Sequence, residues 1–256
     1  WWRKIAQIVS VNYFTQVNGV RLVMAGLLGD VTANGELSSI SLSDEAQSIQ
    51  AKTKGSIISI GRQAIINDDL GVLADVPRAF GFMSARTFNS DFWKKLSDNY
   101  ATLFTAGHKN TMTGALSLAT LATADQKFRD LADKDGNPLG LIDGLLVTSN
   151  SNRAKALELF KATGLIGGST KDANTNVFAG TYEPVCPANL SGAPWMLVAN
   201  PSVAALMRAA FLYGNEQPVV ETAEAAANQL GINIRCYYDY GVETGDWNAG
   251  VYSTGA

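Results

Sequence analysis

The sequence is poor in the residues on which most catalytic and metal sites depend: it has one histidine, His108, and two cysteines, Cys186 and Cys236. No G-x-S-x-G turn is present, so a serine hydrolase would lack both its nucleophile elbow and a partnered base. Two distant cysteines make neither a disulfide framework nor a zinc site, and we interpret them as buried thiols. We therefore expect no enzyme, metal or cofactor; a hydrolase is the disfavoured alternative.

Long apolar runs and clustered positive charge are also missing. No run approaches the roughly 20 residues that span a bilayer, so we expect no membrane partner. The net charge is −3 and the pI is about 5.2. This balance excludes the basic surface of a protein that grips nucleic acid. The acidic pairs Asp68-Asp69 and Asp133 with Asp135 are interpreted as helix caps and turn residues, because the spacing of a calcium loop is absent.

The first quarter of the chain predicts extended structure that cannot form a core alone. Residues 1–14 read as an arm, and its two tryptophans should lie on a surface such as another copy of the chain. Residues 20–62 are rich in glycine, serine and threonine, with turn signals at Asn34-Gly35 and Lys54-Gly55. The segments between these turns alternate, which predicts a long β-hairpin that lies against another body.

The rest of the chain mixes helices and strands. A short helix should end near Asp75, and a long one should start near Pro77, because proline suits a first helical turn, and run to about Asn99. Further helices are expected at residues 117–133 and 150–161, and a short one after Pro201. Strands are expected at residues 141–147, 195–199, 209–213 and, from strict alternation, 232–240.

Several segments together resemble the major head subunit of Mu-like phages and the related capsid proteins often encoded with a fused prohead protease. They lie at residues 10–14 (SVNYF), 61–70 (GRQAIINDDL), 110–117 (NTMTGALS), 135–140 (DGNPLG), 210–218 (AFLYGNEQP) and 238–242 (YDYGV). Their order and spacing agree over nearly the whole chain. The chain departs from the family at Val147-Thr148-Ser149, where the family often has Val-Pro-Pro.

The resemblance implies the α+β Hong Kong 97-type capsid fold. Residues 1–16 would be the remnant of the N-arm and residues 17–62 the extended loop, a β-hairpin. Residues 63–135 would form the peripheral domain with its long spine helix, and residues 136–213 the axial domain. Residues 214–256 would supply terminal strands that complete the sheets. Because the first residue is not methionine and no protease or scaffold region is present, we expect a mature subunit trimmed at its N-terminus.

The same resemblance implies a major capsid protein that self-assembles into an icosahedral head around double-stranded DNA. Its partners would be copies of itself in hexamers and pentamers, weakly and non-specifically held DNA, and portal and decoration proteins. It would be assembled in the bacterial cytoplasm and located in the virion. An encapsulin-like protein compartment, which shares the fold, stays open as the alternative.

Assembly is expected to rest on the arm and the hairpin, without covalent crosslinks, because the region around the hairpin tip has no lysine. The residues expected to take part are Trp1, Trp2, Arg21, Gly29, Asn34, Gly35, Glu36, Lys52 and Lys54.

Overall fold

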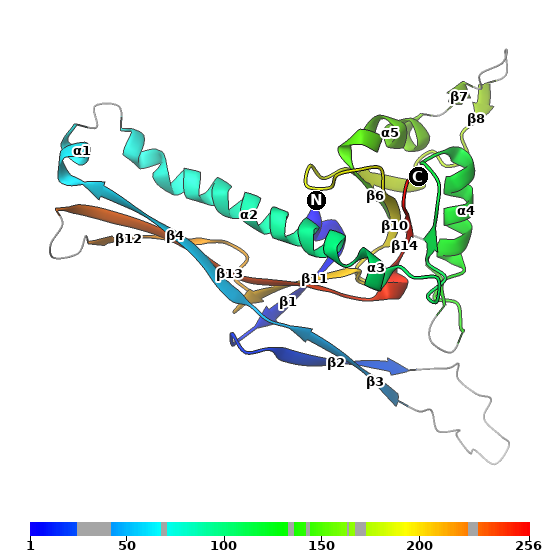
Figure 1. The fold of residues 1–256 in the computed structure, drawn as a ribbon, viewed down its shortest axis with the longest axis horizontal. Coiled ribbons are helices and arrows are strands. Elements are labelled where there is room, and N and C mark those ends of the chain that lie inside the picture. Colours follow the sequence, from blue (N-terminus) through cyan, green and yellow to red (C-terminus); the bar gives the residue numbers. More distant parts are fainter. Residues whose placement is uncertain are drawn as a thin grey trace.

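A computed structural model describes residues 1–24, 42–67, 71–132, 136–141, 144–162, 164–166, 173–224 and 230–256. The chain forms a long arm, built from a helix over a sheet, that extends from a compact cluster of strands and helices (Figure 1). This arm is not the N-terminal arm expected at residues 1–14. A two-stranded hairpin projects from the body below the sheet in that view. The α+β fold class is confirmed.

The sheet of the arm is organised around one long strand, β13 (Gly231–Thr244). Strand β4 (Lys52–Gly61) pairs with it along one edge. The other edge is shared by β12 (Val219–Glu224) and β11 (Met207–Leu212), and β1 (Ala6–Val11) adds to β11 in parallel. Alternation within β13 places Ile234, Cys236, Tyr238 and Tyr240 on its buried face, as the sequence predicted.

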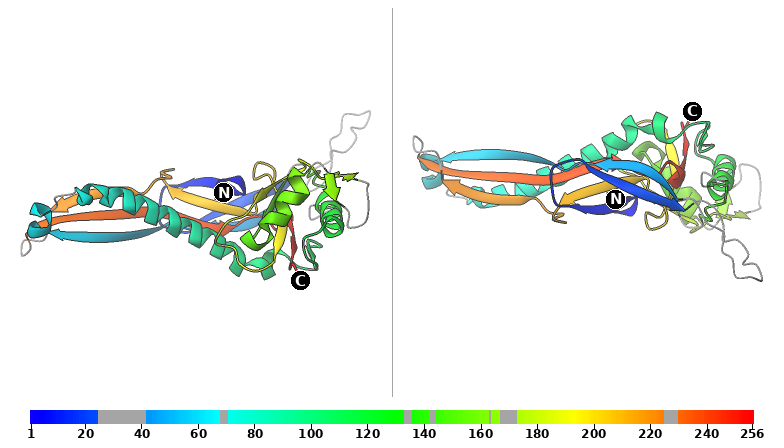
Figure 2. Two further views of the ribbon diagram at one scale, coloured as in Figure 1. Left: turned by 90° about the horizontal axis from the view of Figure 1, so that it is seen from above. Right: turned by 90° about the horizontal axis from the view of Figure 1, so that it is seen from below.

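The long helix α2 (Val76–Asp98) lies over this sheet, and both views of Figure 2 show it running along the arm. Its predicted start is confirmed, since Pro77 occupies the first turn, where no intrahelical N–H is needed. Its buried side chains at helical spacing are Phe80, Ser84, Phe88, Phe92, Trp93 and Leu96. The short helices η2 (Val72–Asp75) and α3 (Tyr100–Leu103) flank it, and α1 (Arg62–Ile66) lies at the far end of the arm.

The compact cluster surrounds a second sheet with the order β5-β14-β10-β6-β9. These strands are β5 (Thr111–Met112), β14 (Gly250–Ser253), β10 (Trp195–Ala199), β6 (Gly144–Thr148) and β9 (Tyr182–Val185). Every residue of β10 is buried, which explains its uninterrupted apolar sequence. The remaining short elements are η1 (Trp2–Lys4), η3 (Asn150–Asn152), η4 (Trp247–Ala249), β7 (Gly164–Ile166) and β8 (Ala173–Thr175).

Two helices accompany this sheet, α4 (Leu118–Arg129) and α5 (Arg153–Lys161). Helix α4 is capped by Ser117, whose Oγ accepts a hydrogen bond from the backbone N–H of Thr120 at 3.2 Å. Helix α4 ends at Arg129, before the expected residue 133. The helix expected after Pro201 is wrong, because the chain makes only a turn there.

The hairpin is shorter than predicted. Strands β2 (Val17–Met24) and β3 (Leu42–Ile49) pair with each other, in the register Val17 with Ile49 to Met24 with Leu42. Residues 52–61, expected in the hairpin, instead form β4 in the sheet of the arm. An alternating pattern predicts a strand, but it does not identify the strand with which the segment pairs. Here β4 pairs with β13, which is longer than β2.

The predicted domain limits do not follow the two sheets. Helix α4 and β5, placed in the peripheral segment 63–135, accompany the second sheet. Strand β11, placed in the axial segment 136–213, belongs to the sheet of the arm. The terminal segment 214–256 does contribute to both sheets, through β12 and β13 to the first and β14 to the second. One hydrophobic core connects α2 with both sheets.

Candidate assembly surfaces

The N-terminal segment belongs to the body of the subunit and does not form a free arm. The ring of Trp2 lies 4.7 Å from that of Phe88, and it also contacts Phe92 and Phe211. Only Trp1, with 63% of its surface exposed, remains available to another copy. Trp2 therefore lies on a surface, as expected of both tryptophans, but that surface is the aromatic face under α2 of the same chain and not another copy.

The hairpin projects from the body (Figure 1). Within the described residues, β2 and β3 form a sheet of their own and pair with no other strand. Its base is fixed by the side chain of Gln50, which donates a hydrogen bond to the carbonyl of Phe14 at 2.8 Å. The backbone of Arg21 pairs with Glu45 in this hairpin. The expected assembly residues Gly29, Asn34, Gly35 and Glu36 lie outside the described residues.

Lys52 and Lys54 lie in β4, and Lys54 has a partner in its own chain. The Nζ of Lys54 is 2.5 Å from Oδ2 of Asp91 on α2. The hydroxyl of Tyr240 donates a hydrogen bond to the same carboxylate. Burial and this hydrogen bond raise the pKa of Tyr240. The cluster joins the edge strand to the helix, but half of the Lys54 side chain is exposed, so the ion pair contributes less than about 1 kcal/mol.

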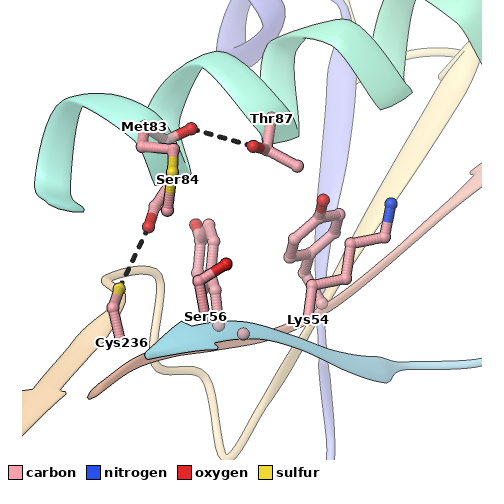
Figure 3. Close-up of a pocket in the computed structure, with 9 residues that line it drawn as sticks. Lys54, Ser56, Met83, Ser84, Thr87 and Cys236 are labelled. Atoms are coloured by element: carbon pink, nitrogen blue, oxygen red, sulfur yellow. Dashed lines mark hydrogen bonds between the residues drawn. The ribbon is translucent and has the colours of Figure 1, made fainter. Parts of the chain in front are cut away.

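A cavity of about 370 Å³ lies between α2 and the sheet, next to this cluster (Figure 3). In it the Oγ of Ser84 donates to the carbonyl of Phe80 at 2.9 Å and lies 3.2 Å from the sulfur of Cys236. The hydroxyl of Thr87 donates to the carbonyl of Met83. None of the residues lining the cavity is a histidine or a carboxylate that could act as a base.

His108 has a packing role. Its ring stacks on Trp247 with 4.3 Å between centroids, and its Nδ1 lies 3.2 Å from the carbonyl of Leu103. The neighbouring Asn110 is fully buried and donates to the carbonyls of Leu103 and Trp247. These contacts anchor the loop to η4. His108 thus lies in a loop, and its side chain is half-buried.

The two thiols differ in burial. Cys236 is buried as predicted, whereas Cys186 is only half-buried, and burial raises the pKa of its thiol. Among the described ranges, no three histidine, cysteine, aspartate or glutamate side chains are grouped as metal ligands. The acidic pairs at residues 68–69 and at 133 and 135 lie outside those ranges. No helix in the described part of the chain has the length and apolar composition needed to cross a membrane.

Comparisons with known proteins agree with this architecture. The fold is similar to the capsid of the cyanophage P-SCSP1u, with a TM-score of 0.65, 11% identity, and coverage of 99% of this chain and 87% of that one. The fold is also similar to the mature capsid of bacteriophage PhiM1, with a TM-score of 0.61, 14% identity, and coverage of 99% of this chain and 86% of that one. A structure from Microbacterium phage Oxtober96 matches with a TM-score of 0.58, 14% identity, and coverage of 98% of this chain and 84% of that one. At these identities the likeness shows the fold alone.

A search of curated proteins finds no match. The profile of the phage capsid protein family matches residues 44–253, which is most of the chain. The match covers the second sheet, the sheet of the arm except β1, the long helix and most of β3. Because this match spans most of the chain, the chain belongs to the phage capsid protein family and is a major capsid protein of a phage head shell.

Proposed function

We propose that this capsid protein forms a closed icosahedral shell of hexamers and pentamers around double-stranded phage DNA, and that the β2–β3 hairpin supplies essential contacts between copies. The observation that carries the proposal is the hairpin's separation from the core. The base of the hairpin contacts the body, where Ile49 packs with Val11, Ala51 and Ala210, and among the described residues β2 and β3 pair with no other strand. A two-stranded ribbon is marginal in water, so it gains stability by lying on a neighbour.

We also propose that the shell holds its DNA weakly and without covalent bonds between subunits. The net charge of −3 opposes strong attraction to phosphate. Positive side chains are also paired with carboxylates: Lys95 lies 2.8 Å from Glu243, and Arg235 lies 2.7 Å from Glu221. Such pairing supports a contact that lets packaged DNA slide. Portal and decoration proteins, and assembly in the bacterial cytoplasm, belong to this proposal as well.

Shortening the hairpin tests its role. Val20 and Ala46 are register partners, so removing residues 21–45 and joining these two through Asn-Gly leaves a short hairpin with a two-residue turn. Ile49 and Gln50, which fix the base, are retained. We expect a folded subunit that no longer forms closed particles. A longer deletion that reached Lys52, which the sequence analysis placed in the extended loop of residues 17–62, would remove Ile49 and Ala51 from the core.

Two readouts separate the outcomes of this experiment. Circular dichroism and thermal melting should show a fold as stable as that of the full chain, because β2 and β3 pair with no strand of the body among the described residues. Electron microscopy should show particles for the full chain and none for the shortened one. Closed particles of normal size from the shortened chain would contradict the role of the hairpin.

The packaged DNA is tested separately. Particles isolated with their contents should protect double-stranded DNA from nuclease, whereas free subunits should bind duplex DNA no more tightly than about 10⁻⁴ to 10⁻⁶ M at physiological salt. Particles that hold a protein cargo and no nuclease-resistant DNA would contradict the proposal and favour the protein-compartment alternative.

A further inference from the structure

The β2–β3 hairpin is joined to the sheet of the arm by a very short connection. Strand β3 ends at Ile49 and β4 begins at Lys52, so Gln50 and Ala51 alone lie between them. Ile49 and Ala51 are buried, with exposed fractions of 7% and 0%. We call residues 49–51 the root of the hairpin. In Figure 1 the hairpin lies below the sheet of the arm and α2 lies above it.

The root lies on a row of residues that come from three neighbouring strands. Val9 of β1 is the register partner of Ala210 of β11, and Ala210 is the register partner of Gly241 of β13. The next pair along, Phe211 and Tyr240, points towards α2, where both rings contact the helix. Because successive residues of a strand point to opposite faces, the row faces away from α2. We call this row the seat.

The root approaches the seat closely. A Cβ on Gly241 would lie 2.1 Å from the carbonyl oxygen of Gln50 and 3.2 Å from the backbone nitrogen of Ala51. The peptide group between Gln50 and Ala51 therefore rests directly on the backbone of Gly241. On either side of it, Ile49 and Ala51 pack with Ala210 in one small cluster. Glycine and alanine at the seat leave the space that the root occupies.

The second strand of the hairpin is tied to the same place. The side chain of Gln50 donates a hydrogen bond to the carbonyl of Phe14 at 2.8 Å, and β2 begins at Val17, three residues later. Among the described residues, no strand of the body pairs with β2 or β3. The root is therefore the place where the body can set the direction of both strands.

We infer that the seat sets the direction in which the hairpin leaves the body, with Gly241 and Ala210 as its positioning residues. A larger side chain at Gly241 would push the root away from the sheet, and the hairpin beyond it would turn as a lever. Ser43 lies six residues along β3 from Ile49, about 20 Å away, so a rotation of about 10° moves it by about 3.5 Å. The inference rests on the proposed role of the hairpin and names the residues that aim it.

The direction of the hairpin can be measured in unassembled subunits as the distance between two spin labels. The half-buried thiol is first removed by Cys186→Ser, and the buried Cys236 is left in place. Ser43→Cys then carries one label on the hairpin. Ala85→Cys carries the other on α2, at an exposed position across the sheet from the seat. Pulsed electron paramagnetic resonance gives the distribution of distances between them.

Gly241→Ala in this labelled chain is compared with Gly245→Ala as a matched control. The new Cβ at residue 245 would lie 2.0 Å from the carbonyl oxygen of Ala205, which is not part of the root. Both variants therefore clash with a backbone carbonyl, and both should melt at a lower temperature than the parent. We expect the distance maximum to move by at least about 3 Å in Gly241→Ala and to stay unchanged in Gly245→Ala.

A third variant, Ile49→Ala, removes packing at the root without introducing a clash, and it should broaden the distance distribution. A folded Gly241→Ala subunit with the distribution of the parent would overturn the inference, and so would an equal shift in Gly245→Ala. If Gly241→Ala does not fold, an unchanged distribution in Ile49→Ala would overturn it instead.

Particle formation by the same variants separates the seat from the function on which it rests. Electron microscopy should show fewer closed particles for Gly241→Ala than for Gly245→Ala, because only the first variant turns the hairpin. A Gly241→Ala chain with a displaced hairpin and a normal yield of closed particles would contradict the proposed role of the hairpin and leave the seat in place.

Discussion

Replacing Trp2 by alanine tests whether the N-terminal segment belongs to the core of the subunit. The Trp2 ring contacts Phe88, Phe92 and Phe211 under α2. Removing a fully buried tryptophan costs about 3–5 kcal/mol, and aromatic pairs add about 0.5–1.5 kcal/mol beyond their buried area. Because Trp2 is half-buried, we expect a loss of about 2–3 kcal/mol in the free energy of unfolding.

Trp1 provides a matched control next to it in the sequence. It is 63% exposed, and its described interaction is the amine of Lys4, 5.8 Å from its ring centroid. Trp1→Ala should therefore cost less than about 1 kcal/mol. For a chain of this size 1 kcal/mol corresponds to roughly 2–4 °C in Tm, so a loss of about 2–3 kcal/mol in Trp2→Ala should lower Tm by about 4–12 °C.

The assay is thermal melting of unassembled subunits, followed by circular dichroism at low protein concentration, because fluorescence would itself change with tryptophan number. Equal and small shifts for the two variants would refute the packing of Trp2 on the core. A loss confined to particle formation, with no change in subunit stability, would restore the interpretation of residues 1–14 as an arm that lies on another copy.

Three further predictions use the same preparations. Gly241→Ala should destabilise the subunit by at least about 2 kcal/mol in the same melts, because a Cβ there would lie 2.1 Å from the carbonyl oxygen of Gln50. Gly81→Ala, with no atom within 4 Å of the new Cβ, should instead stabilise α2 by up to about 1 kcal/mol. Equal effects of the two substitutions on the free energy of unfolding would contradict this prediction. The free energy of unfolding should fall as pH rises from about 10 towards 12, because burial raises the pKa of Tyr238 to about 12 and raises that of Tyr240 as well. The protonated tyrosines stabilise the fold fully below their unfolded pKa near 10, and this contribution is lost as pH approaches their folded pKa values. An unchanged urea midpoint between pH 9 and 11.5 would contradict this prediction. Boiled particles on a reducing denaturing gel should give one band near 27 kDa, the mass of the chain, and a ladder of covalent multimers would contradict a non-covalent shell.

The elements predicted most closely are those specified by a local pattern. Pro77 and a helical apolar stripe define α2, and an unbroken apolar run defines the buried β10. The strict alternation of residues 232–240 identifies the central strand β13. In each case a single segment contains the information, because its own period or composition already specifies how it is buried.

What could not be predicted depends on contacts between distant segments. Residues 52–61 alternate equally well as one arm of a hairpin or as a partner of β13, and only the assembled sheet decides between them. Trp2 is apolar, but nothing near it in the sequence identifies Phe88 and Phe211 as the surface that it covers.

Electron microscopy of the purified full chain tests the central claim most directly. The capsid family and the projecting hairpin together predict closed, uniform shells once subunit concentration and ionic strength allow assembly. A folded subunit that stays monomeric at every protein concentration and salt concentration tried, with no particles or capsomers visible, would contradict it.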